Sequence, residues 1–138
     1  LVREVAESMK QRGGGSVVLF SSMYGLVSPD PRIYELPLTP NPLDYGASKA
    51  AILQMTRYLA VHYGRDKVRC NSVVPGPFPH ADFQRDHAGT TAAIAKKCPM
   101  ERIGRAEEIV GPTLFLLGDA SSYMTGHDLV VDGGWTAW

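Results

Sequence analysis

Hydrophobic residues at the start of the chain recur three and four positions apart, the spacing of one helix face. They are Leu1, Val2, Val5, Ala6 and Met9. Charged residues occupy most of the positions between them. Residues 1–11 therefore predict the end of an amphipathic helix, and Gly13 is the stop that follows it.

Three runs of hydrophobic residues lack this helical spacing and predict strands. Residues 16–20 are almost continuously apolar, as expected of a parallel strand covered on both faces. Residues 68–74, which end at a Pro-Gly turn, and residues 129–131 are the second and third predicted strands. A helix joining the first two strands would form a right-handed crossover, so both strands would end at the same edge of the sheet. The pattern predicts an α/β fold with about three parallel strands.

Two further helices and one long loop complete the pattern. Residues 43–63 are apolar nearly all round, so this helix must be covered on more than one side. Another helix begins within residues 102–108 and runs to Leu117, and Pro112 inside it should produce a kink. Residues 29–42 contain five prolines, which neither a helix nor a central strand tolerates, so this segment predicts a loop.

The long helix carries a chemically suggestive pair, Tyr45 and Lys49. Residues four apart on a helix lie one above the other, so the phenol and the ammonium project from the same face. A tyrosine pKa near ~10 falls when a cation is held close, because the cation favours the phenolate. Tyr45 is thus a candidate general acid/base. Taken alone, however, the pair is better explained as two ordinary residues on a half-exposed helix.

Four motifs in order along the chain resemble the short-chain dehydrogenase/reductase (SDR) family. They are Ser21-Ser22-x-x-Gly25, Tyr45-x-x-x-Lys49, the segment 71–76 (Asn-Ser-Val-Val-Pro-Gly) and the segment 126–134 ending in Asp-Gly-Gly. The resemblance runs from the first residues to the last and implies a Rossmann-like doubly wound parallel sheet. Family members are about twice this length, so residues 1–138 would be the C-terminal half of one domain. The glycine-rich turn that binds the cofactor pyrophosphate belongs to the other half, and residues 13–15 do not replace it because they precede a strand.

The resemblance also implies a reaction, which is hydride transfer between NAD or NADP and an alcohol or carbonyl compound. Tyr45 would carry the proton, and Ser22 would hydrogen-bond the substrate oxygen. Lys49 would lower the tyrosine pKa and bind the nicotinamide ribose. The residues implied to lie beside the nicotinamide are Pro75, Gly76 and Phe78. His80 stands where many relatives have a threonine that contacts the cofactor.

Residues 29–42 form a longer connection than most relatives have, which we interpret as an insertion over the active site. Tyr24 and Tyr34 are candidate substrate-binding residues, and Ile33 and Leu36 are candidates for the pocket wall. A surface loop without substrate contact is the alternative. Similar residues occur in members associated with sugar or sugar-acid metabolism, and residues 81–97 correspond to the substrate lid.

Composition narrows the remaining function classes. The 14 basic and 14 acidic residues balance and do not cluster, which argues against nucleic-acid or membrane-surface partners. No apolar run is long enough for a membrane span. Cys70 and Cys98 lack metal-ligand spacing and suggest two reduced thiols in a cytoplasmic protein. The acidic and histidine residues of 80–87 also fit no standard metal site.

Assembly and two rival functions stay open at this point. The apolar long helix predicts a homodimer or homotetramer formed through the long helices, as in the family. A hydrolase with Ser22 as nucleophile is a weak rival, because no Gly-x-Ser-x-Gly elbow surrounds it. The stronger rival is an inactive fragment or a helix-pairing interaction module that lacks the pyrophosphate site. The choice between NAD and NADP and the identity of the substrate are not encoded in these motifs.

Overall fold

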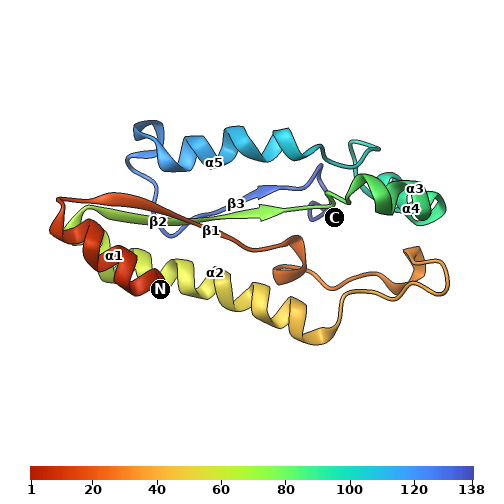
Figure 1. Ribbon diagram of the computed structural model, residues 1–138, viewed down its shortest axis with the longest axis horizontal. Coiled ribbons are helices and arrows are strands. Elements are labelled where there is room, and N and C mark those ends of the chain that lie inside the picture. The colour runs from red at the N-terminus through yellow and green to blue at the C-terminus, as the bar shows by residue number, and fades with distance from the viewer.

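The computed structural model describes residues 1–138 as a parallel three-stranded sheet with helices on both faces (Figure 1). The strands are β1 (Gly15–Phe20), β2 (Val68–Pro75) and β3 (Asp128–Val131), in the order β1-β2-β3. Helices α1 (Val2–Gln11) and α2 (Leu43–Tyr63) cover one face, and α5 (Val110–Leu117) covers the other. The predicted doubly wound α/β fold with three parallel strands is confirmed.

The central strand β2 is buried, whereas the edge strand β1 is only partly buried. Val68, Val73 and Val74 of β2 have no exposed surface. The residues of β1 are half-buried or exposed, and Phe20 at its end is 45% exposed. Helices α1 and α5 pack on its two faces, as expected, but β1 stays only partly buried because it lies at the edge of the sheet and pairs only with β2.

The first of two core clusters packs α1 and α2 against the sheet. Its buried members are Ala6, Leu59, Ala60, Tyr63, Val68 and Cys70. Val2 and Met9 pack against this cluster, as expected from the helical spacing. Leu1 is 91% exposed and does not take part, because it precedes the first residue of the helix. The predicted amphipathic helix is otherwise confirmed.

Helix α2 has the predicted bounds and presents two apolar faces. The face toward the sheet buries Leu53, Thr56, Leu59, Ala60 and Tyr63. The other face leaves large side chains open: Leu43, Tyr58 and Val61 are 92%, 59% and 87% exposed. Coverage of this second face by a partner subunit stays a prediction. No helix is both long and apolar enough to cross a membrane.

The segment around Pro112 differs from the single kinked helix that the sequence predicted. A short 3-10 helix (Ala106–Ile109) is followed by α5, which begins at Val110. Pro112 thus lies in the first turn of α5, where a backbone nitrogen has no helical carbonyl to bond. The proline therefore removes no backbone hydrogen bond from this helix.

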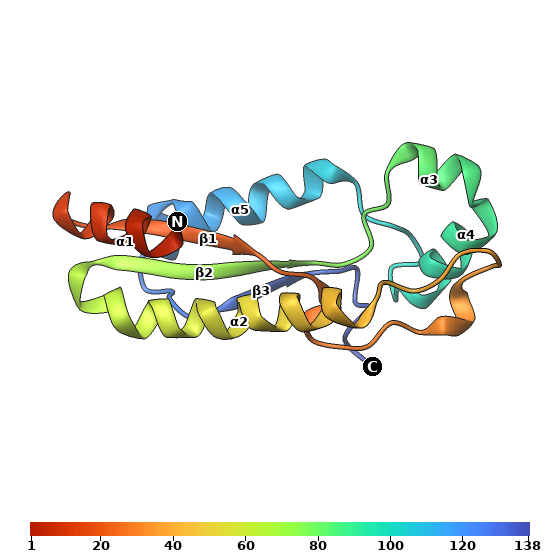
Figure 2. The same ribbon diagram turned by 60° about the horizontal axis from the view of Figure 1, so that its bottom comes forward.

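Two helices lie beyond the carboxyl end of the sheet, α3 (Ala81–Asp86) and α4 (Ala88–Lys97). Figures 1 and 2 show the proline-rich segment 29–42 running beside them. That segment is mostly loop, as predicted, with one 3-10 turn at Pro31–Ile33. The region above the strand ends is thereby enclosed by elements far apart in the sequence.

Candidate active site

The carboxyl ends of the three strands bring the predicted motifs to one edge. Ser21 follows β1, and its backbone N–H donates to Val73 of β2 at 2.9 Å. Gly76 follows β2, and its N–H donates to Val131 of β3, also at 2.9 Å. The serine pair and the Pro-Gly turn therefore meet at the edge where open parallel sheets bind their ligands.

The turn after β1 is held directly against the backbone of α2. Gly25 ends a 3-10 helix (Met23–Gly25), and a Cβ atom on it would lie 2.8 Å from the carbonyl carbon of Lys49. A Cβ on Gly46 would lie 3.0 Å from the carbonyl oxygen of Tyr24. The Ser21 hydroxyl donates to the carbonyl of Lys49 at 2.7 Å. Two glycines thus allow a close approach that fixes the serine turn beside the long helix.

Ser22 is 8% exposed, and its side chain has one hydrogen bond within the chain. Its Oγ accepts from the backbone N–H of Tyr24 at 3.2 Å, which caps the 3-10 helix. A serine hydroxyl that accepts one bond still has its proton to donate. Ser22 can therefore donate to an oxygen placed above the strand edge.

Tyr45 and Lys49 lie together, as their spacing predicted. The Lys49 ammonium is 5.5 Å from the centroid of the Tyr45 ring. The same ammonium donates to the carbonyl of Phe20 at 3.4 Å, so it bridges α2 to the end of β1. The structure thus brings Ser22, Tyr45 and Lys49 to one place, while their catalytic roles stay predictions.

The two candidate substrate-binding tyrosines are joined to each other. The hydroxyls of Tyr24 and Tyr34 are 2.9 Å apart. Burial raises the pKa of Tyr24 well above its ordinary value, and the hydrogen bond with Tyr34 raises it further. Tyr24 therefore stays a neutral hydrogen-bonding group and is unsuited to proton transfer near neutral pH.

The proposed hydrophobic wall of the insertion is only partly present. Ile33 packs against a second core cluster, formed by Met23, Tyr24, Ile94, Cys98 and Trp135. Tyr45 packs against the same cluster. Leu36 is 92% exposed, so its assignment to the wall of a pocket is wrong. It lies beyond the residues of the insertion that contact the cluster, and its side chain points to solvent.

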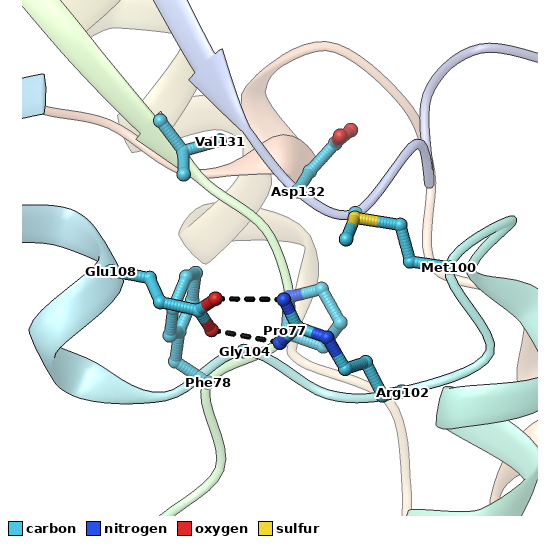
Figure 3. A pocket seen from close by; sticks show the side chains of 9 residues that line it. Pro77, Phe78, Met100, Arg102, Gly104, Glu108, Val131 and Asp132 are labelled. Carbon is cyan, nitrogen blue, oxygen red and sulfur yellow. Dashed lines mark hydrogen bonds and ion pairs between the residues drawn. The ribbon is translucent and has the colours of Figure 1, made fainter.

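Phe78 lines a pocket of about 270 Å³ that none of the predicted catalytic residues borders (Figure 3). Its ring lies so close to Gly104 that no Cβ atom fits there. Arg102 and Glu108 line this pocket side by side and are joined by two hydrogen bonds of 2.7 and 2.8 Å (Figure 3). Arg102 and the backbone N–H of Arg105 lower the Glu108 pKa to about 2. The sequence analysis did not single out this pair, because the residue types alone do not show that the short loop between them turns the two side chains toward each other.

The turn after β3 has a structural use for its acidic residue. The Asp132 carboxylate accepts from the backbone N–H of Gly134 at 2.8 Å and from the Thr136 hydroxyl at 2.7 Å. Gly76 packs so closely on Asp132 that a Cβ atom would overlap it. The Pro-Gly turn is thereby held between the ends of β2 and β3.

The fold and the grouping of Ser22, Tyr45 and Lys49 define a class, the Rossmann-like α/β proteins with a serine, a tyrosine and a lysine at the strand edge. Comparison with known families makes this specific. The family model described as Enoyl-(Acyl carrier protein) reductase matches residues 1–136. The chain belongs to the short-chain dehydrogenase/reductase family.

Several curated and solved proteins are similar to the chain. A tropinone reductase homolog from Arabidopsis thaliana is 38% identical over 128 residues, covering 91% of this chain and 44% of that protein. D-arabinitol 2-dehydrogenase (ribulose-forming) from Scheffersomyces stipitis is 36% identical over 129 residues, covering 90% and 43%. The structure of a gluconate 5-dehydrogenase from Burkholderia cenocepacia in complex with NADP and tartrate has a TM-score of 0.86 at 27% identity, covering 99% and 51%.

A short-chain dehydrogenase from Leptospira borgpetersenii with bound NAD+ gives the same picture. Its TM-score is 0.86 at 31% identity, with 98% of this chain and 50% of that chain covered. The chain thus spans about half the length of the relatives it matches.

Proposed function

We propose that this chain carries the proton-transfer residues of an NAD- or NADP-dependent dehydrogenase that interconverts an alcohol and a carbonyl compound. The observation that carries the proposal is that Lys49 lies beside the Tyr45 ring and bonds the end of β1, while Ser21 holds the turn that carries Ser22 against the same helix. Relatives that include an arabinitol dehydrogenase and a gluconate dehydrogenase support a sugar, polyol or sugar-acid substrate.

The residues present fit the nicotinamide end of such a cofactor. Lys49 forms no ion pair, and its single hydrogen bond is the 3.4 Å contact to Phe20, so its ammonium has donors left for ribose hydroxyls. Pro75 and Gly76 would pass beside the ring, and Phe78 follows them as the turn leaves the sheet. When bound, the nicotinamide supplies the hydride chemistry.

The chain's own residues would handle the proton and the substrate oxygen. In the oxidative direction the phenolate oxygen of Tyr45 accepts the proton of the substrate hydroxyl, and in the reductive direction the phenol returns it. Ser22 donates a hydrogen bond to that oxygen and stabilises the negative charge that develops on it. The hydroxyls of Tyr24 and Tyr34 are suited to binding a second hydroxyl of the substrate.

Association through α2 belongs to the same proposal. The exposed side chains of Leu43, Tyr58 and Val61 form an apolar face on a helix that is already packed on the sheet. Burying such side chains against a second copy releases water from apolar surface and stabilises a dimer.

The decisive experiment is Tyr45→Phe in the whole protein that contains this chain. Turnover should fall about 10²- to 10⁴-fold, the usual contribution of a positioned acid/base, while cofactor affinity is retained. Tyr123→Phe is the matched control, because Tyr123 is fully exposed and lies outside both the candidate site and the apolar face of α2. Near-normal turnover of Tyr45→Phe would overturn the assignment. Titration of the 138-residue chain with NADH and NADPH shows separately whether it binds a dinucleotide by itself.

A further inference from the structure

Asp30, at the start of the proline-rich segment, contacts two basic side chains, one of which is close in the sequence and one far away. Its carboxylate accepts two side-chain hydrogen bonds from Arg32, at 2.9 and 2.8 Å, and one from the Arg32 backbone at 3.0 Å. These local bonds cap the 3-10 turn. Its Oδ2 atom is also 3.4 Å from the ammonium of Lys97, 67 positions further along the chain. The Asp30 and Lys97 side chains are 14% and 29% exposed, so the pair is partly shielded from water.

Lys97 joins three separate segments at the end of α4. It is the last residue of that helix, where a positive charge is favourable. Its ammonium also lies 4.7 Å from the centroid of the Trp135 ring, and Trp135 is 2% exposed. The contact with Asp30 therefore ties the proline-rich segment to α4 and to the buried Trp135.

A second fastening lies at the other end of α4. The backbone N–H of Glu35 donates to the hydroxyl of Thr90 at 3.2 Å, and Thr90 is fully buried in the first turn of the helix. The Glu35 carboxylate lies so close to Gly89 that a Cβ atom there would overlap it. Ile33 and Ile94 meet in the second core cluster between these two ends. The segment thus follows α4 along its whole length.

The position of α4 matters because its inner face closes the space beside the candidate catalytic tyrosine. Ile94 belongs to the cluster against which Tyr45 packs. The ring of each proline fixes one backbone dihedral angle, so a segment with five prolines resists bending. Such a stiff segment can therefore keep α4 at a fixed position relative to the serine turn.

We propose that residues 30–35 act as a brace that holds α4 over Tyr45, fastened by Asp30 to Lys97 at the end of the helix and by Glu35 to Thr90 in its first turn, and that Asp30 and Thr90 are positioning residues. The brace and α4 then open and close as one body when substrate enters or leaves. This proposal concerns the arrangement of the chain, and it can be tested without any enzymatic activity.

The test is amide hydrogen exchange of residues 31–36 and 88–97. In Asp30→Asn, the asparagine can still cap the 3-10 turn but the charge on Lys97 is unpaired. In the double variant Asp30→Asn/Thr90→Val, both fastenings are lost. We expect exchange in both segments to rise together by about tenfold in the double variant, since each lost bond lowers the local opening free energy. Arg85→Gln is the control, because it removes ion pairs confined to α3.

A second pair of variants keeps the test valid if Thr90→Val fails to fold. Lys97→Met keeps the length of the side chain without its charge, and Lys97→Arg keeps the charge. Exchange in residues 88–97 should rise in Lys97→Met and stay at the native level in Lys97→Arg. The proposal is wrong if both variants behave alike, or if residues 88–97 keep native protection while residues 31–36 lose theirs.

In the whole protein the kinetic consequence is specific. Asp30→Asn should raise KM for the substrate more than it lowers kcat, because a loosened brace weakens enclosure of the substrate and leaves the acid/base group intact. A loss confined to kcat would contradict the brace.

Discussion

Replacing Gly25 with alanine tests the contact that fixes the serine turn against α2. The Cβ atom of an alanine would lie 2.8 Å from the carbonyl carbon of Lys49 and 3.0 Å from the backbone nitrogen of Ala50. Gly25 does not have a positive φ angle, so the backbone conformation itself accepts alanine. The whole effect must therefore come from the overlap.

The magnitude follows from what has to move. Carbon atoms in contact are separated by about 3.5–4.0 Å, so the turn and the helix must part by roughly 0.7–1 Å. Both sides of the contact are backbone and cannot adjust by changing a rotamer, which places the cost at about 1–3 kcal/mol. The 2.7 Å bond from Ser21 to Lys49 would lengthen past the hydrogen-bonding range and add about 1 kcal/mol.

Urea and thermal unfolding of the native chain and of Gly25→Ala provide the assay. A loss of about 2–4 kcal/mol corresponds to a fall in Tm of roughly 8–16 °C for a chain of this size. Gly64→Ala is the matched control: Gly64 has helical dihedral angles, and an added Cβ would meet nothing within 4 Å. This variant should gain about 0.4–1 kcal/mol. If Gly25→Ala unfolds within about 0.5 kcal/mol of the native chain, the contact does not fix the turn.

Two further predictions concern ionic groups. The Arg69 guanidinium donates to oxygens at and just after the end of α5 at 2.9–3.0 Å. Arg69→Met should therefore lower the free energy of unfolding in urea by about 2–4 kcal/mol. Arg3→Met is the control, because Arg3 is exposed on α1 and its loss should change the free energy of unfolding very little; equal effects of the two variants would contradict this prediction. The folded-state pKa of Glu108 is about 2, below its unfolded value near ~4.3. The contribution of the ionised Glu108 carboxylate to the free energy of unfolding is therefore present above pH ~4.3 and lost as the pH falls toward 2. The stability difference between the native chain and Glu108→Gln should shrink over that range, and a difference independent of pH would refute the assignment.

The sequence predicted the elements whose signals are local. The apolar pattern gave the bounds of α2, and the order of strand and helix placed Ser22 beside Tyr45 and Lys49, because parallel strands joined by a right-handed crossover end at one edge. Helical spacing alone was enough to put Tyr45 and Lys49 on one face.

Other features depend on residues far apart in the chain and could not be predicted in this way. The exposure of Leu36 follows from where the insertion meets α4, and the contact of Asp30 with Lys97 spans 67 positions. The role of Gly25 was visible as a motif, but its cause appears only in the packing of two backbones. The partial burial of β1 depends on which strand lies next to it.

The free edge of β1 has a consequence for the kinetics of folding. One side of residues 15–20 presents backbone N–H and C=O groups that no strand pairs with, and such an edge accepts a strand from another chain. Folding of one chain is first order in concentration, whereas edge-to-edge association is at least second order. Dilution therefore shifts the competition toward the folded monomer, and the yield of refolded chain should rise as the concentration falls.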